Sequence, residues 1–171
     1  TATQNFSLEV PASPDGTVKL VRGNAGAGTQ DLITVNSAGV VKTPQNVVAF
    51  SVYRSTDQTV TDTVMTKVQF DSKTFDTTNA FDNVTSYRFT PAVAGYYVFT
   101  SNVSCKASPM SATVISIRKN GAEVQTNTLQ VTYNGNSSTA ANVCVYLNGS
   151  GDYMEVFCQI NGTSPKFGGG S

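Results

Sequence analysis

The stretch of residues 70–101, FDSKTFDTTNAFDNVTSYRFTPAVAGYYVFTS, most tightly constrains how this chain can fold. Pro91 and Gly95 mark a turn between two apolar runs, and apolar residues then alternate through Tyr97 and Phe99. Alternation with a period of two is typical of a half-buried β-strand. The stretch therefore predicts a short strand, a polar loop, a second strand, a tight turn and a long strand that enters a buried sheet.

Similar alternating segments follow one another from residue 49 onward. No apolar period of 3.6 residues, the mark of an amphipathic helix, extends over a useful length. Asn120-Gly121 predicts a hairpin turn, because these residues tolerate the positive φ angles of such turns. We expect an all-β domain with further turns at 133–136 and 148–152 and with strands over residues 49–55, 64–70, 85–90, 95–105, 112–118, 123–133, 140–147 and 153–160.

Two of the expected strands carry apolar side chains on both faces. In the segment NVCVYL, Val143 and Val145 point one way while Cys144 and Tyr146 point the other. Residues 96–99 have the same two-sided character. Only one face of a strand meets the core of a sandwich, so the second face needs another cover. This pattern predicts a homo-oligomer.

The N-terminal residues differ from the remainder and predict two domains: a β-rich stem of a fibre over residues 1–46, and a globular head over residues 47–171. The stem contains the short β pieces FSLEV, TVKLVRG and DLITVNSAGVVKTP, separated by breaks that contain Pro and Gly. Such short pieces bury too little surface to fold alone. We therefore expect them to intertwine with identical chains.

Charge and composition argue against several classes of function. Eleven basic and eleven acidic residues give a net charge of zero, whereas nucleic-acid-binding proteins normally carry a basic surplus or stripe. No run of 18 apolar residues is present that would insert into a membrane. The chain has no histidine, which removes Ser-His-Asp and Cys-His catalysis. We expect no enzyme, and hence no catalytic residues, and neither a metal site nor a cofactor.

Calcium is the one ion for which the sequence offers a set of ligands. The carboxylates of Asp57 and Asp62 form one group, and those of Asp71, Asp76 and Asp82 form another. Carboxylate oxygens suit calcium. Aspartates in polar loops are more often simply solvated, and we expect solvated loops here.

The three cysteines, Cys105, Cys144 and Cys158, each lie within an apolar strand pattern. They lack Cys-x-x-Cys spacing, which argues against a metal site or a redox motif. We expect three small buried hydrophobic side chains. Cys144 and Cys158, facing each other diagonally across a hairpin, are the only pair that the pattern places within reach of a disulfide.

The spacing of the aromatic residues resembles the globular head of complement component 1q, a jelly roll related to the tumour-necrosis-factor fold. The resemblance covers about residues 48–167, and FTPAVAGYYVF, residues 89–99, is its most specific part. It implies a ten-stranded, homotrimeric jelly-roll sandwich. Gly95 is expected where a side chain would spoil a backbone conformation or a close contact. The residues assigned to the core and to trimer packing are Phe70, Phe81, Phe89, Gly95, Tyr97 and Phe99.

Two features depart from the family pattern. The gap between Phe81 and Phe89 is one residue longer, which predicts an extended hairpin turn. The family closes with an aromatic-x-Ser-Gly-aliphatic strand beside the first strand, and this sequence reaches Ser171 where that strand would begin. We expect the last strand to follow Ser171, or else to be supplied elsewhere, because its loss would leave ladder groups unpaired.

The residues before the head indicate a biological setting. Heads of this fold in animals typically follow a collagen stalk, whereas residues 1–46 contain no Gly-x-y repeat. Their Thr- and Asn-rich β pieces look like the stems of bacteriophage tail fibres. We expect an extracellular virion protein, the trimeric tip of a tail fibre or spike that binds host cells and contacts other tail proteins. The alternatives are a purely structural trimerisation cap and a secreted ligand-binding head.

The receptor-binding residues are unknown from sequence. A neutral surface rich in Tyr, Asn and Thr suits hydrogen bonding to a host-cell surface glycan or an outer-surface protein. Three heads on one stem would add avidity to weak single contacts. The candidate contact loops are 55–62, 71–83 and 133–139.

Overall fold

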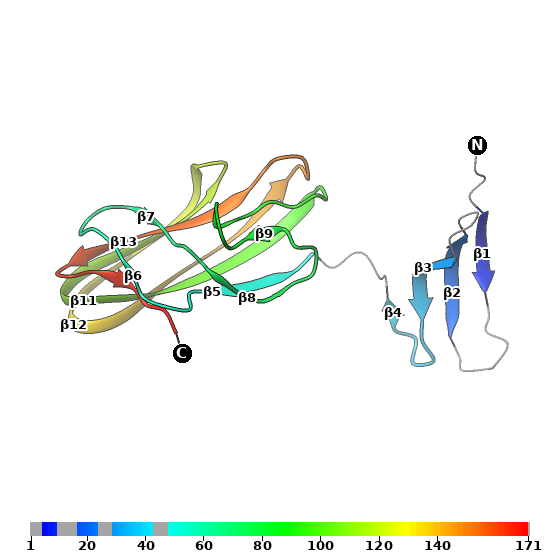
Figure 1. Ribbon diagram of the computed structural model, residues 1–171, viewed down its shortest axis with the longest axis horizontal. Helices are drawn as coiled ribbons and strands as arrows, with labels where there is room; N and C mark the ends of the chain where they lie inside the picture. Colours follow the sequence, from blue (N-terminus) through cyan, green and yellow to red (C-terminus); the bar gives the residue numbers. More distant parts are fainter. Residues whose placement is uncertain (1–4, 10–16, 24–28, 43–47, 171) are drawn as a thin grey trace. The chain divides into compact units, whose positions relative to one another are not determined.

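The computed structural model of the protein describes residues 5–9, 17–23, 29–42 and 48–170. The chain divides into two compact units, Thr1–Val47 and Val48–Ser171. Every regular element in the described ranges is a β-strand, which confirms the all-β fold (Figure 1). The Pro- and Gly-containing breaks expected in the stem fall largely on residues 10–16, 24–28 and 43–47, outside the described residues.

The N-terminal unit contains a four-stranded sheet in the order β1-β2-β3-β4. Each strand pairs antiparallel with the next one in the sequence, so the described ladders form within one chain. The expected intertwining with identical chains stays a prediction. The strands are β1 (Asn5–Glu9), β2 (Val18–Gly23), β3 (Thr29–Val35) and β4 (Val41–Lys42).

The head is a β-sandwich of the jelly-roll type, built around one hairpin of two long strands, β11 (Gly95–Lys119) and β12 (Ala122–Leu147). The expected Asn120-Gly121 turn joins them, with φ angles of 52° and 81°. Shorter strands complete the sandwich. They are β5 (Phe50–Tyr53), β6 (Gln58–Thr59), β7 (Thr66–Lys67), β8 (Ser72–Asp76), β9 (Phe81–Asp82), β10 (Arg88–Phe89), β13 (Met154–Gly162) and β14 (Lys166–Phe167).

β11 and β12 bend together at their midpoints. The pairing of the two strands is irregular between Ala107 and Ala112, and Gly135 lies opposite Ala107 at this level. The sequence predicted separate strands over 95–105 and 112–118 and a turn at 133–136, and this was wrong. A bulge lets a strand change direction while its ladder continues, so both strands run on through the bend.

The bend places the two halves of the hairpin in opposite layers of the sandwich. The first layer contains residues 95–107 of β11 and 135–147 of β12, followed by β14 and β6. The second layer contains the remaining halves of both strands, with β13, β10, β9 and β7. β5 and β8 form a separate two-stranded ladder.

The connection over residues 148–152 crosses between the layers. β12 ends at Leu147 in the first layer, and β13 begins at Met154 in the second, where it pairs with β11. The predicted hairpin between these two strands was therefore wrong. The strands expected over 64–70 and 85–90 are confined to the two residues of β7 and of β10.

Gly149 in this connection takes the role that was expected of Gly95. Gly149 has a φ of 67°, and a Cβ there would lie 2.4 Å from the backbone nitrogen of Ala94. A Cβ on Gly95 would meet only the Tyr97 ring, at an ordinary contact distance of 3.8 Å. The tight approach between the 148–152 connection and the start of β11 thus depends on Gly149.

Aromatic side chains fill the core between the layers. Phe89 stacks on Phe50 with a centroid distance of 4.5 Å, and it meets the edges of Phe99 and Tyr97 at 5.6 Å. Phe81, Phe89 and Phe99 are buried, whereas Phe70 and Tyr97 are half-buried. Fully buried aliphatic and aromatic residues from both layers complete the core: Ile115, Ile117, Leu147, Ile160 and Phe167.

Asp152 links the Asn120-Gly121 turn to the connection over residues 148–152. Its carboxylate accepts hydrogen bonds from Lys119 Nζ at 2.9 Å, from Asn120 Nδ2 at 2.7 Å and from the backbone N–H of Asn148 at 3.0 Å. The bonds from Lys119 and Asn120 lower the pKa of Asp152 to about 2.

We expect Phe89→Ala to lower the free energy of unfolding by about 3–5 kcal/mol, because it removes the ring at the centre of the aromatic cluster and leaves a cavity. Phe75→Ala is the matched control, since Phe75 is 48% exposed and should cost less than about 1 kcal/mol. Urea unfolding of the two variants measures both values. Equal losses would contradict the central position of Phe89.

The melting temperature should stay level above about pH 5 and fall between about pH 4 and pH 2. Asp152 has a lower pKa in the folded chain than in the unfolded chain, so it stabilises the fold above the unfolded value and stops doing so as the pH falls through about 2. Asp152→Asn should make the acid decline shallower. A thermal melt series measures this, and an unchanged slope in the variant would contradict the assignment.

Candidate functional site

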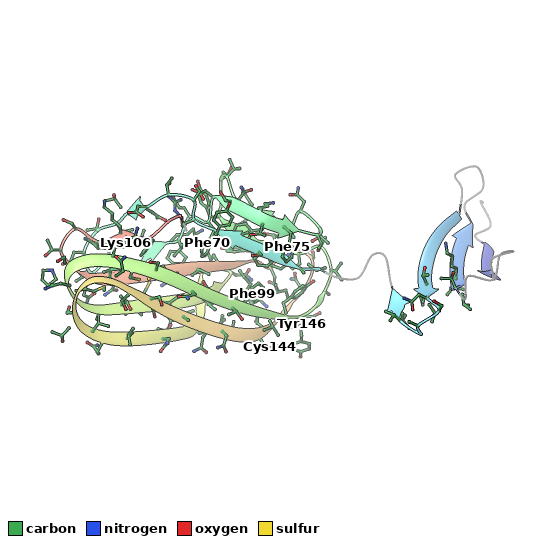
Figure 2. The ribbon with its side chains drawn as sticks, turned by 90° about the horizontal axis from the view of Figure 1, so that it is seen from below. Phe70, Phe75, Phe99, Lys106, Cys144 and Tyr146 are labelled. Carbon is green, nitrogen blue, oxygen red and sulfur yellow. The ribbon has the colours of Figure 1, made fainter. Side chains whose placement is uncertain are left out.

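An exposed apolar patch lies on the outer side of the first layer. It consists of Tyr96 and Val98 on β11 and Cys144 and Tyr146 on β12, and we call it the outer face. Tyr96 is 80% exposed, Val98 76% and Tyr146 46%. In the ladder Tyr96 lies opposite Tyr146 and Val98 opposite Cys144. Figure 2 shows Cys144 and Tyr146 along β12, with Tyr146 pointing away from the sandwich.

The alternate residues of the same strands turn toward the core. Phe99 is buried, and Tyr97, Val143 and Val145 pack partly buried against the core cluster. The alternate residues of these strands thus face opposite sides, as expected, while the homo-oligomer that would cover the outer side stays a prediction. Contiguous exposed apolar residues of this kind are typical of surfaces for association.

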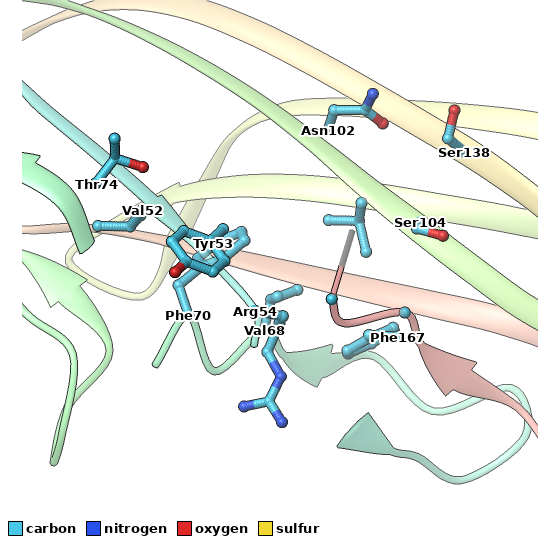
Figure 3. A pocket seen from close by; sticks show the side chains of 13 residues that line it. Val52, Tyr53, Arg54, Val68, Phe70, Thr74, Asn102, Ser104, Ser138 and Phe167 are labelled. Carbon is cyan, nitrogen blue, oxygen red and sulfur yellow. The ribbon is translucent and has the colours of Figure 1, made fainter. Parts of the chain in front are cut away.

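A groove of about 520 Å³ runs between β5 and the first half of β11, and we call it the edge groove. Figure 3 shows Val52, Tyr53 and Phe70 toward one side, and Asn102, Ser104 and Ser138 toward the other. Phe70, which was assigned to core or trimer packing, lies here half-buried. The groove therefore combines apolar side chains with two strand edges.

The C-terminal residues enter one end of the edge groove and bridge both of its edges. The N–H of Gly168 donates to the carbonyl of Ser104 at 2.8 Å, and that of Gly170 donates to the carbonyl of Arg54 at 3.0 Å. A Cβ on Gly169 would lie 2.1 Å from the backbone of Thr56, so this passage requires glycine. At this end the groove is one strand wide.

Further along the edge groove the facing backbone groups have no ladder partner in the described residues. Every second residue of β11 points the same way as Ser104, so Asn102 and Thr100 direct their N–H and C=O groups into the groove. β14 pairs with β11 only at Cys105 and Lys106. This is the place beside the first strand where the family's closing strand was expected.

A second, polar pocket of about 500 Å³ lies at the β9–β10 edge of the second layer, and we call it the polar pocket. Two of its side chains, Lys73 and Arg88, are cationic. The guanidinium of Arg88 stacks over the Tyr153 ring at 4.1 Å. The full lining is Lys73, Asn79, Ala80, Phe81, Asp82, Asn83, Ser86, Arg88 and Thr90.

Two aspartates fix the loops around the polar pocket. Asp76 accepts hydrogen bonds from the N–H groups of Ala80 and Phe81 at 3.1 and 2.9 Å. Asp82 accepts from the N–H groups at 84, 85 and 86 and from the Ser86 hydroxyl, the last at 2.6 Å. The Ser86 hydroxyl and these N–H groups hold the pKa of Asp82 well below its usual range. The pocket walls are therefore rigid.

Burial acts to raise the pKa of Asp76, but hydrogen bonds from Phe81 and Lys73 outweigh it and lower that pKa. Lys73 Nζ also donates to Asn79 Oδ1 at 3.0 Å. The amide N–H groups of Asn79 and the guanidinium N–H groups of Arg88 have no hydrogen-bond acceptor among the described residues. The side-chain amide of Asn83 donates an N–H to the Asp71 carbonyl, which leaves the Asn83 amide oxygen as an available acceptor. The pocket offers fixed donors and acceptors together.

The three candidate contact loops are only partly loops. Residues 71–83 contain β8 and β9, and they supply one wall of the polar pocket. Residues 133–139 lie inside β12, and residues 55–62 contain β6, which pairs with β14. Sequence reasoning missed Arg88 and Thr90 as residues of the polar pocket, because residues 85–90 were assigned to a strand and not to a candidate contact loop.

The aspartates considered for calcium do not gather in the described residues, where no group of three possible metal ligands occurs. Asp57 pairs with Lys106 at 2.7 Å, and Asp62 accepts the N–H of Gly162 at 2.7 Å. Asp71 pairs with Arg54 at 3.1 Å. The calcium hypothesis stays a prediction.

Cys105 and Cys158 are buried, as predicted, but Cys144 is not. Cys144 is exposed on the outer face, whereas burial was predicted, because its side of β12 has no covering layer in the single chain. β12 and β13 lie in different layers, so Cys144 does not face Cys158 across a hairpin. Cys158 instead lies beside Cys105, with their sulfurs 3.7 Å apart.

Comparison with known proteins agrees with this architecture. No helix in the described residues is long and apolar enough to cross a membrane. A search of curated protein sequences gives no significant match. The family model described as the C1q domain matches residues 49–169, which is most of the chain. The match includes the bent hairpin, the outer face, the polar pocket and the lining of the edge groove except Gly170. The chain therefore belongs to the C1q domain family.

Proposed function

We propose that this chain is the trimeric tip of a bacteriophage tail fibre or spike, and that it binds the host-cell surface without catalysis. One observation carries the proposal: the C1q domain is preceded in the chain by a four-stranded β meander, which is the stem. C1q domains are typically extracellular, self-assemble into trimers and bind ligands, and they are generally not enzymes. The proposal extends these properties to a virion.

The outer face is the surface through which the heads associate. Two tyrosines, a valine and a cysteine stand exposed on one ladder, and Tyr96 and Tyr146 pack their rings together at 5.4 Å. Burying this patch against identical heads removes apolar area from water at roughly 25 cal/mol per Å². The stem would join the head to other tail proteins.

The polar pocket is the place where a host-surface glycan binds. Sugars present hydroxyl groups that both donate and accept hydrogen bonds, and the pocket offers both kinds of partner on rigid loops. Its volume of about 500 Å³ suits one or two sugar units. Three pockets on one trimer would convert weak single contacts into avidity. Neither a metal nor a cofactor is part of this proposal.

We expect Val98→Asp to dissociate the trimer, because a charge in the centre of the outer face cannot be buried without a partner. Val84→Asp is the matched control, since Val84 is also exposed but lies in the loop after β9. Sedimentation velocity at micromolar concentration compares the two variants with the unaltered chain. A monomer for the unaltered chain, or a trimer for Val98→Asp, would contradict the assignment.

We expect the purified trimer to block adsorption of the parent phage, and Arg88→Met to weaken this block about tenfold or more by removing charged donors from the polar pocket. Arg118→Met is the matched control, because Arg118 also stacks on an aromatic ring, Phe157 at 4.3 Å, outside the pocket. Adsorption competition at a series of protein concentrations measures the effect.

The outcomes of this competition separate the functions. No competition by the unaltered trimer at saturating concentration would leave the structural cap as the function. Competition that is equally strong with Arg88→Met would retain receptor binding but remove it from the polar pocket. Trimerisation of Arg88→Met should be unchanged, since the pocket and the outer face lie on different strands.

A further inference from the structure

Two buried thiols meet in the middle of the sandwich, from opposite layers. Cys105 lies in the first-layer half of β11, where it pairs with Phe167 of β14. Cys158 lies on β13 in the second layer, opposite Ile115. Both side chains are fully buried, with zero exposure. Their sulfurs are 3.7 Å apart, and the residues are 53 positions apart in the chain.

This separation is close to what a disulfide requires. A bonded pair has its sulfurs about 2.05 Å apart, so the two sulfurs must approach by less than about 2 Å in total. Small rotations of two side chains can supply such a movement. The third cysteine, Cys144, is exposed on the outer face and is not part of this pair.

We propose that Cys105 and Cys158 form a disulfide that links the two layers of the head once the chain is in an oxidising medium, such as that around a virion. A low-molecular-weight disulfide, such as oxidised glutathione, is the oxidant. One protein thiolate attacks it, forming a mixed disulfide and releasing one small thiolate, which takes up a proton. The second protein thiol loses its proton, and its sulfur displaces the other small thiol. The protein thus loses two protons and two electrons, and the oxidant becomes two thiols.

The bond forms when the core opens transiently in that medium. The contact with Cys105 and the burial of both thiols raise the pKa of Cys158 above its ordinary value, so the closed core holds neither a thiolate nor room for an oxidant. Once closed, the core protects the disulfide from reduction in the same way. The bond is therefore a permanent structural disulfide, which we call the brace, and not a regulatory one.

The brace acts where the sandwich has few covalent constraints. Within the described chain the layers are joined by the bend of the long hairpin and by connecting loops, and otherwise by packing. A disulfide that spans 53 residues restricts the unfolded chain strongly. We expect it to raise the melting temperature by about 5–15 °C.

The test uses the full chain with Cys144→Ser, which leaves only the proposed pair. This variant is unfolded, refolded in a mixture of oxidised and reduced glutathione, denatured again and treated with iodoacetamide. We expect no alkylation, an intact mass about 2 Da below that of the reduced chain, and a cross-linked peptide pair containing Cys105 and Cys158. A reduced sample should take up two alkyl groups.

Thermal melts of the oxidised and reduced forms complete the test. Two alkylated thiols after oxidative refolding, or links only between chains, would overturn the proposal. A cross-linked form that melts lower than the reduced form would also overturn it, because the native core would then not accommodate the bond. Adding Cys105→Ala should abolish the redox-dependent difference in melting temperature. If that variant does not fold, the mass of the Cys144→Ser chain decides.

Discussion

The shared bend of β11 and β12 is the constraint on which the rest of the head depends. Because both strands change direction at the level of Ala107 and Gly135 without leaving their ladder, one hairpin supplies two neighbouring strands to each layer. When each strand of a sandwich stays in one layer, a loop must carry the chain from one layer to the other. Here one continuous ladder sets the layers face to face, and the aromatic cluster around Phe89 fills the space between them. The neighbours of Cys105 and Cys158 follow from the same geometry.

Although the head carries little charge, aspartate side chains hold several of its connections in place. The layers are held by apolar packing, which leaves the acidic residues free to work at the ends and edges of the strands. Asp76 and Asp82 each collect several hydrogen bonds from one short connection, and Asp152 collects its own from two turns. Charged residues make up only 13% of the chain, and three of them thus fix connections. Two of the three, Asp76 and Asp82, hold the loops around the polar pocket.

Local patterns in the sequence predicted the parts of the fold that depend on local rules. The period of two predicted all-β structure, and Asn120-Gly121 predicted its turn, because each rests on backbone preferences of a few residues. The bend could not be predicted, since Asn134-Gly135 is as typical of a turn as of a bulge and only the partner strand decides between them. The connection over residues 148–152 was wrongly predicted to be a hairpin turn for the same reason. The Cys105–Cys158 contact joins residues 53 positions apart, and no local pattern encodes it. The polar pocket is lined by residues 73–90, whose side chains come together through turns and hydrogen bonds that the period of two does not report.

The two proposed surfaces of the head can act independently because they belong to different parts of the sandwich. The outer face lies on the β11–β12 ladder of the first layer, whereas the polar pocket lies at the β9–β10 edge of the second. Association through the outer face leaves the β9 edge uncovered by that contact. Assembly and ligand binding therefore place no conflicting demands on any one strand, and the loops at the edge can vary in sequence while the trimer contact is kept. Such a separation suits a protein that must keep one architecture while it adapts to different surfaces.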